Sequence, residues 1–160
     1  VAARVDLMTS LAIASGVRGM VGGQALDIAA ETATTPLTLD EITTLQAGKT
    51  GALITWSAMA GPRMAQADTA ALQAYGDALG LAFQIADDIL DVEGDAATVG
   101  KAVGKDESAG KATFVSLLGL DAAKRRAKAL VDEACDALSP YGNDAETLRD
   151  AARYVITRDK

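Results

Sequence analysis

Apolar positions recur along the chain with the spacing of α-helices, not with the alternation of strands. Residues 5–32 carry apolar side chains on nearly every face, which predicts a long helix that is buried on most sides. Gly16, Gly19, Gly22 and Gly23 lie inside it, and each costs about 1 kcal/mol relative to alanine. We therefore expect a neighbouring helix or a ligand to approach closely there, although ordinary helix packing would explain any single glycine.

A second helix is expected over residues 38–61. Its first four residues, TLDE, have the pattern of a capping box, in which Thr38 and Glu41 satisfy each other's backbone N–H groups. In the middle of this helix, two glycines flank Lys49 and Thr50. This arrangement predicts a local fault in the helix.

The remaining chain predicts four more helices, with a charged, glycine-rich loop after the first of them. These helices are expected at about 68–92, 111–118, 121–138 and 144–157. Asp121 and Asn143 are the expected N-caps of the last two, and Asn143 with Glu146 has the pattern of another capping box. We see no convincing strand, so the prediction is an all-α module of about six helices.

Composition agrees with this prediction. Hydrophobic residues make up 49% of the 160 residues and aromatic residues only 4%, and the helix formers Ala and Leu dominate. No apolar stretch reaches the roughly 20 residues that a membrane helix needs, and no signal-peptide pattern is present. The single cysteine, Cys135, cannot form an internal disulfide, so we expect a cytoplasmic location.

Charge and residue usage exclude several classes of function. The net charge is −7 with no basic stripe, which argues against binding to nucleic acid or to an anionic membrane surface. The chain contains no histidine, so an imidazole base and a histidine-ligated zinc or iron site are excluded within it. The P-loop and dinucleotide-binding fingerprints are absent.

The segment FQIADDILDV at 83–92 places Asp87, Asp88 and Asp91 in an apolar run. On a helix, Asp87 and Asp91 share a face, and their like charges repel. Seven acidic residues and no basic one lie between residues 64 and 100. A solvated acidic face is the simple alternative, but the apolar flanks leave little room for one. We therefore expect Mg²⁺, which takes oxygen ligands from carboxylates and from a polyphosphate.

Other polar residues complete this hypothesis. Lys49 and Lys101 can bind the same phosphates as positive charges, and Thr50 adds a hydroxyl. Gln84 lies three residues before Asp87, roughly on the same face. It is either an ordinary amphipathic position or a group that orients the site by a hydrogen bond.

Several ordered segments resemble the trans-isoprenyl diphosphate synthases. FQIADDILD at 83–91 resembles their second aspartate-rich motif, GKTGAL at 48–53 their Lys-Thr motif, GGQALD at 22–27 their Gly-Gln segment, and VGKAVGKDESAGKATFVSLLG at 99–119 their lysine loop. The tail AARYVITRDK resembles the C-terminus of bacterial farnesyl diphosphate synthases. The resemblance is collinear over essentially all 160 residues, with one departure at Gln46, where relatives frequently have histidine.

The resemblance implies a helical bundle of the isoprenoid-synthase type and a magnesium-dependent prenyltransferase. Such an enzyme condenses an allylic diphosphate with isopentenyl diphosphate, here to a short-chain product that we expect to be farnesyl diphosphate. Carried over by position, Asp87 would ligate Mg²⁺ with help from Asp88 and Asp91. Lys49 and Lys101 would bind the allylic diphosphate, and Lys105 would assist them. Thr50 and Gln84 would line the reaction centre, and Phe83 would touch the isoprenoid part. Lys49, Thr50, Gln84 and Lys101 are thus the candidate catalytic residues.

Residues 1–86 lack the first DDxxD-type motif that this family needs. We therefore expect residues 1–160 to be the C-terminal portion of a single domain of about twice this length, and to be inactive alone. Apolar faces left exposed by the missing half predict a homodimer or a higher assembly. Two alternatives remain: a non-catalytic regulatory subunit of a heteromeric prenyl synthase, and a plain helical metal-binding module.

Overall fold

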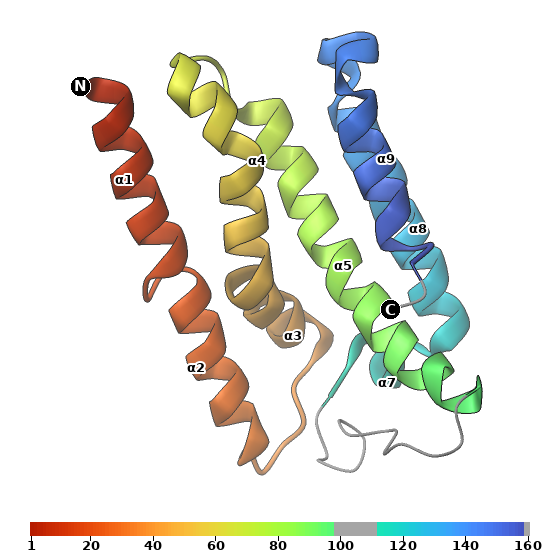
Figure 1. The fold of residues 1–160 in the computed structure, drawn as a ribbon. Coiled ribbons are helices and arrows are strands. Elements are labelled where there is room, and N and C mark those ends of the chain that lie inside the picture. The colour runs from red at the N-terminus through yellow and green to blue at the C-terminus, as the bar shows by residue number, and fades with distance from the viewer. Residues whose placement is uncertain (98–111, 159–160) are drawn as a thin grey trace.

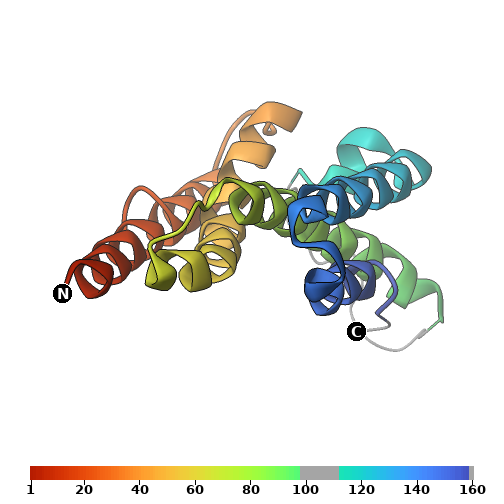
Figure 2. The ribbon, with the colours of Figure 1, turned by 90° about the horizontal axis from the view of Figure 1, so that it is seen from above.

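The computed structural model describes residues 1–97 and 112–158, and all regular structure within these ranges is helical. The all-α prediction is therefore confirmed. The helices stand side by side in a bent row, from α1 and α2 at one end to α8 and α9 at the other (Figures 1 and 2). They are α1 (Ala2–Ser15), α2 (Met20–Glu31), α3 (Leu39–Gln46), the π-helical segment η1 (Ala47–Gly51), α4 (Ala52–Ala65), α5 (Ala70–Ala97), α7 (Phe114–Leu118), α8 (Leu120–Ala137), the 3-10 segment η2 (Ser139–Ala145) and α9 (Glu146–Val155).

The continuous buried helix expected over residues 5–32 is wrong in two respects. The chain breaks between Ser15 and Met20, where a Cβ on Gly19 would lie 2.0 Å from the carbonyl oxygen of Ala14. In the described structure, α1 contains no buried residue, and Met8 is 73% exposed. The physical reason is that α1 packs mainly against one neighbour, α4, which leaves its other faces open.

The second predicted helix is correct in position and in its internal fault. The Thr38 backbone N–H donates to the Glu41 carboxylate at 2.8 Å, and the Glu41 N–H donates to the Thr38 hydroxyl at 3.3 Å, so the capping box is confirmed. The fault is the π-helical turn η1, which joins α3 to α4. A Cβ on Gly80 of α5 would lie 2.9 Å from the Cα of Gly51, so this turn sits directly against α5.

Helix α5 is the centre of the fold, since it packs against α4 on one side and α8 on the other. The core between α5, α7 and α8 contains Tyr75, Ile85, Phe114, Leu130 and Leu138, each at most 2% exposed. Burial of such side chains contributes about 1.5–3 kcal/mol each. No helix in the described ranges combines the length and the apolar character that crossing a bilayer requires.

Both N-cap predictions for the last helices are wrong. Helix α8 begins at Leu120 behind Gly119, whose φ of +81° favours glycine, and Asp121 lies inside its first turn. Asn143 lies within η2, and the residue that precedes α9 is Ala145, which makes no side-chain cap. A 3-10 turn has replaced the expected helix start.

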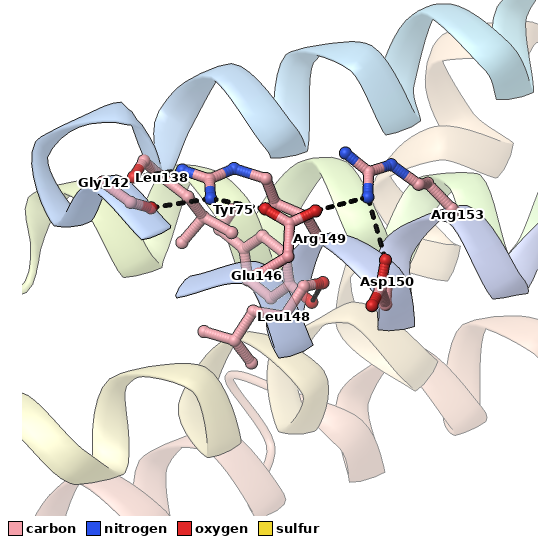
Figure 3. A network of polar contacts seen from close by, with 8 residues as sticks. All are labelled: Tyr75, Leu138, Gly142, Glu146, Leu148, Arg149, Asp150 and Arg153. Atoms are coloured by element: carbon pink, nitrogen blue, oxygen red, sulfur yellow. Dashed lines mark hydrogen bonds and ion pairs between the residues drawn. The ribbon is translucent and has the colours of Figure 1, made fainter. Parts of the chain in front are cut away.

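The side chain of Arg149, instead of a cap, fastens α9 to the preceding turn (Figure 3). Arg149 donates to the backbone oxygens of Gly142 at 2.7 Å and Leu138 at 3.0 Å, which closes the turn between α8 and α9. The buried Tyr75 hydroxyl of α5 donates to the Leu148 oxygen at 2.8 Å. These bonds direct the C-terminal residues back toward α5.

Candidate functional site

A cavity of about 440 Å³ is lined by residues of α2, α3, η1 and α5 and by the loop segments 33–37 and 112–113. It brings together five of the predicted site residues and one acid that was not predicted. These residues are Asp27, Lys49, Gln84, Asp87, Asp88 and Asp91. A cavity lined by several carboxylates and an ammonium group suits a ligand that carries charges of its own.

Helix α5 supplies most of the polar groups of the cavity because it has one apolar face that packs into the protein and one polar face that lines the cavity. Ile85 and Ala86 are 1% and 5% exposed and pack into the protein. Gln84, Asp87 and Asp91 follow the spacing of one helix face and line the cavity. The carboxylates are therefore partly open to the cavity instead of being enclosed by the apolar run.

Lys49 enters the cavity from η1 and meets an acid from α2. Its ammonium group donates to the Asp27 carboxylate at 2.8 Å, and the two side chains are 33% and 14% exposed. The neighbouring Thr50 hydroxyl donates to the Gln84 side-chain oxygen at 2.5 Å. Lys49 thus links η1 to α2, and Thr50 links η1 to α5.

Asp87 has a basic partner after all. The guanidinium of Arg158, from the C-terminal segment, pairs with the Asp87 carboxylate and lies over the Phe83 ring at 4.1 Å from its centroid. The Arg158 side chain is only 13% exposed. Residues 64–100 contain no basic residue, and the structure supplies a positive charge from more than sixty residues away in sequence.

The other two aspartates have different surroundings. Asp88 accepts a hydrogen bond from the Phe114 backbone N–H at 2.7 Å, so it also fixes the start of α7. Asp91 is exposed at the cavity edge. Asp88 thus has a structural role beside its predicted one.

The donor set fits Mg²⁺ if a diphosphate completes it. Magnesium prefers oxygen ligands and is commonly held by one or two carboxylates together with substrate phosphates. Within the described ranges, no group of three acids, cysteines or histidines is arranged to hold an ion unaided. Asp87 and Asp91 nevertheless share the cavity, with Lys49 beside them for phosphate oxygens.

Comparison with known proteins decides the family. The model of the polyprenyl synthetase family matches residues 3–153. The chain belongs to the polyprenyl synthetase family. Farnesyl diphosphate synthase of Escherichia coli K12 is 42% identical over 164 residues, which cover 98% of this chain and 54% of that protein.

Comparison with solved structures agrees with this assignment. An FPP/GFPP synthase from Zymomonas mobilis matches with a TM-score of 0.84 and 48% identity, over 96% of this chain and 51% of that one. A geranyltransferase from Helicobacter pylori, complexed with magnesium and isoprenyl diphosphate, matches with a TM-score of 0.75 and 34% identity, over 97% and 51%. The chain therefore spans about half the length of these relatives.

Four predicted residues are not among the described residues that line the cavity, and one of them, Thr50, reaches Gln84 from η1. Lys101 and Lys105 lie outside the described residues. Phe83 contacts Arg158 and is not part of the described cavity lining.

Sequence reasoning missed Asp27 and Arg158. Asp27 follows Gly23 by four residues, so the two share a helix face, and that spacing could have revealed it. For Arg158 the signal was the excess of acids before residue 100, which calls for a cation from elsewhere in the chain.

Proposed function

We propose that this chain provides the diphosphate-binding wall of a trans-prenyltransferase, a short-chain synthase of the farnesyl type. The cavity that gathers Lys49, Gln84 and the α5 aspartates supports this most directly. The relatives, about twice as long, are named farnesyl diphosphate synthase. We therefore place the activity in a domain of about that length, with residues 1–160 as its C-terminal portion.

The ionic residues would bind the leaving group. Asp87 and Asp91, assisted by Asp88, would hold Mg²⁺, which supplies Lewis-acid charge for the diphosphate oxygens when it is bound. Lys49 would donate N–H groups to the same diphosphate. Positive charge that is fixed before the reaction stabilises a departing diphosphate without the cost of reorganising solvent.

The neutral residues would face the organic part of the reaction. When the allylic C–O bond breaks, the diphosphate takes the electron pair and leaves an allylic cation, which the double bond of isopentenyl diphosphate attacks before a proton is lost. The linked oxygens of Thr50 and Gln84 can stabilise such a cation by their dipoles without capturing it. Contact of Phe83 with the isoprenoid chain, and of Lys101 and Lys105 with phosphate, stay part of this proposal.

The test is condensation by the full-length gene product, supplied with labelled isopentenyl diphosphate, geranyl diphosphate and Mg²⁺. We expect a farnesyl product, identified by chromatography after dephosphorylation, and no product after chelation of the metal. Residues 1–160 expressed alone should give none. Lack of condensation by the full-length protein would contradict the proposal, and pyrophosphate binding without condensation would favour a regulatory subunit.

The homodimer and the cytoplasmic location stay predictions. Exposed apolar side chains along α1, α2 and the turn between them support the first, among them Met8, Val17, Leu26 and Ile28. Their exposed fractions lie between 53% and 81%. A surface of this kind commonly meets a partner.

A further inference from the structure

We infer that Asp27 is a positioning residue of this site, whose carboxylate holds Lys49 in the direction from which it receives the substrate diphosphate. The inference rests on the proposed function, because it concerns how a substrate-binding lysine is kept in place. It is carried by three observations: a close backbone crossing, an ion pair and a shared cavity.

The crossing of α2 over η1 fixes the distance between Asp27 and Lys49. A Cβ on Gly23 would lie 2.1 Å from the backbone nitrogen of Lys49, and a Cβ on Gly48 would lie 3.3 Å from the Cα of Gly23. Only glycine permits this approach of one backbone to the other. Asp27 lies four residues after Gly23, on the same face of α2, and therefore projects along the face that meets η1.

The ion pair then fixes the direction of the lysine. Asp27 Oδ2 accepts from Lys49 Nζ at 2.8 Å, and the Asp27 side chain is the more buried of the two at 14% exposure. A lysine has a flexible four-carbon stem, so an anchored carboxylate restricts it before any ligand arrives. An ammonium group carries three donors, so Lys49 can keep Asp27 and still donate to phosphate oxygens.

A carboxylate in this place has opposite effects on binding and on turnover. Its negative charge repels a diphosphate in the same cavity, so it does not improve substrate affinity. Its contribution is orientation, and a misplacement of about 1 Å can cost up to about a hundredfold in rate. Loss of the carboxylate should therefore lower kcat while the KM for the allylic diphosphate stays the same or falls.

The experiment is a double-mutant cycle in the full-length gene product, with Asp27→Asn, Lys49→Met and the two combined. We expect Asp27→Asn alone to lower kcat about tenfold to a hundredfold without raising the KM for geranyl diphosphate. In the Lys49→Met background the same change should cost less than twofold, because the lysine through which Asp27 acts is gone.

The matched control is Asp6→Asn. Asp6 of α1 forms an ion pair with Arg63 of α4 at 2.9 Å, between helices that lie away from the cavity. This variant should leave kcat and KM unchanged. A loss in Asp6→Asn equal to that in Asp27→Asn would mean that any inter-helix ion pair matters equally, and it would overturn the inference.

Two further results would overturn it: a wild-type kcat in Asp27→Asn, or kcat losses that multiply in the double variant. If Asp27→Asn does not fold, the cycle is run with Asp27→Ser and judged by the same outcomes. Asp27→Glu keeps the charge and should recover part of kcat. A wild-type protein without turnover would contradict the proposed function itself, whereas an active wild type with an unaffected Asp27→Asn contradicts only this inference.

Discussion

The lysine proposed to bind phosphate and the aspartate proposed to bind the metal already form ion pairs inside the protein. Lys49 pairs with Asp27, and Asp87 pairs with Arg158. The first pair leaves donors free for a phosphate, because an ammonium group has three N–H bonds. The second competes with a metal for a carboxylate, so the two pairs should respond to ligands in opposite ways.

We predict that Arg158→Gln strengthens the binding of magnesium pyrophosphate. Removal of the guanidinium frees Asp87 from an ion pair of the kind that contributes about 0.2–1 kcal/mol, so the apparent affinity should rise up to about fivefold. Calorimetry on the full-length protein measures this. Lys124→Gln is the control, since Lys124 pairs with the exposed Glu93 of α5; weaker binding in Arg158→Gln than in this control would contradict the prediction.

For single residues, the sequence predicted which side chains belong to the site better than it predicted which side chains pair with them. The acids of α5 were found because their neighbours are apolar, and Lys49 and Thr50 because glycines flank them. Asp27 and Arg158 were missed because their roles depend on which helices meet, and a pattern along one helix does not contain that information.

At the scale of elements, glycines determine how closely the helices approach. Gly23 lies against the backbone of η1, and Gly51 against Gly80 of α5. The π-helical turn η1 is thus clamped between α2 and α5. The glycines between residues 16 and 23 that lower helix propensity therefore have two uses, a break at Gly19 and a close crossing at Gly23.

Gly23→Ala should destabilise the protein by about 1–3 kcal/mol, because the new methyl group meets backbone atoms that cannot turn aside. Denaturant unfolding of the full-length protein measures the loss. Gly61→Ala in α4 is the matched control: nothing lies within 4 Å of its Cβ, so it should stabilise the helix by about 0.5–1 kcal/mol. Equal effects in the two variants would show that the crossing is not tight.

The contact between α5 and α9 should weaken at alkaline pH. Burial raises the pKa of Tyr75 above its ordinary value of 10.0. The neutral hydroxyl therefore stabilises the fold fully below about pH 10, and this stabilisation is lost as the pH rises through the higher pKa of the folded state.

Tyr75→Phe removes the hydrogen bond to Leu148 and should cost about 1 kcal/mol at pH 8. It should also flatten the fall in melting temperature between pH 9 and pH 11. A fall as steep as that of the wild type would show that Tyr75 does not titrate in this range.

For the whole molecule, helical periodicity was enough to predict the class and the order of most helices. It did not predict the break at Gly19, because four glycines in an apolar run fit either a packed helix or a turn. It placed α8 and α9 within two residues of their starts but assigned the wrong caps: Asp121 and Asn143 suit N-caps in isolation, whereas Gly119 and Arg149 determine the observed turns.

The helices form a bent row (Figure 2), and large apolar side chains along α1 and α2 are exposed. This open architecture agrees with a match to about half of each relative's length. The central claim is that the acidic face of α5 binds magnesium together with a diphosphate. Asp87 is the residue on which that claim depends most.

Titration calorimetry of pyrophosphate into the full-length protein, with and without Mg²⁺, tests this claim most directly. We predict binding that requires Mg²⁺ and that weakens at least about tenfold in Asp87→Ala, whereas Glu93→Ala, farther along α5, binds as the wild type does. Pyrophosphate binding that is independent of Mg²⁺, or that is unchanged in Asp87→Ala, would contradict the account.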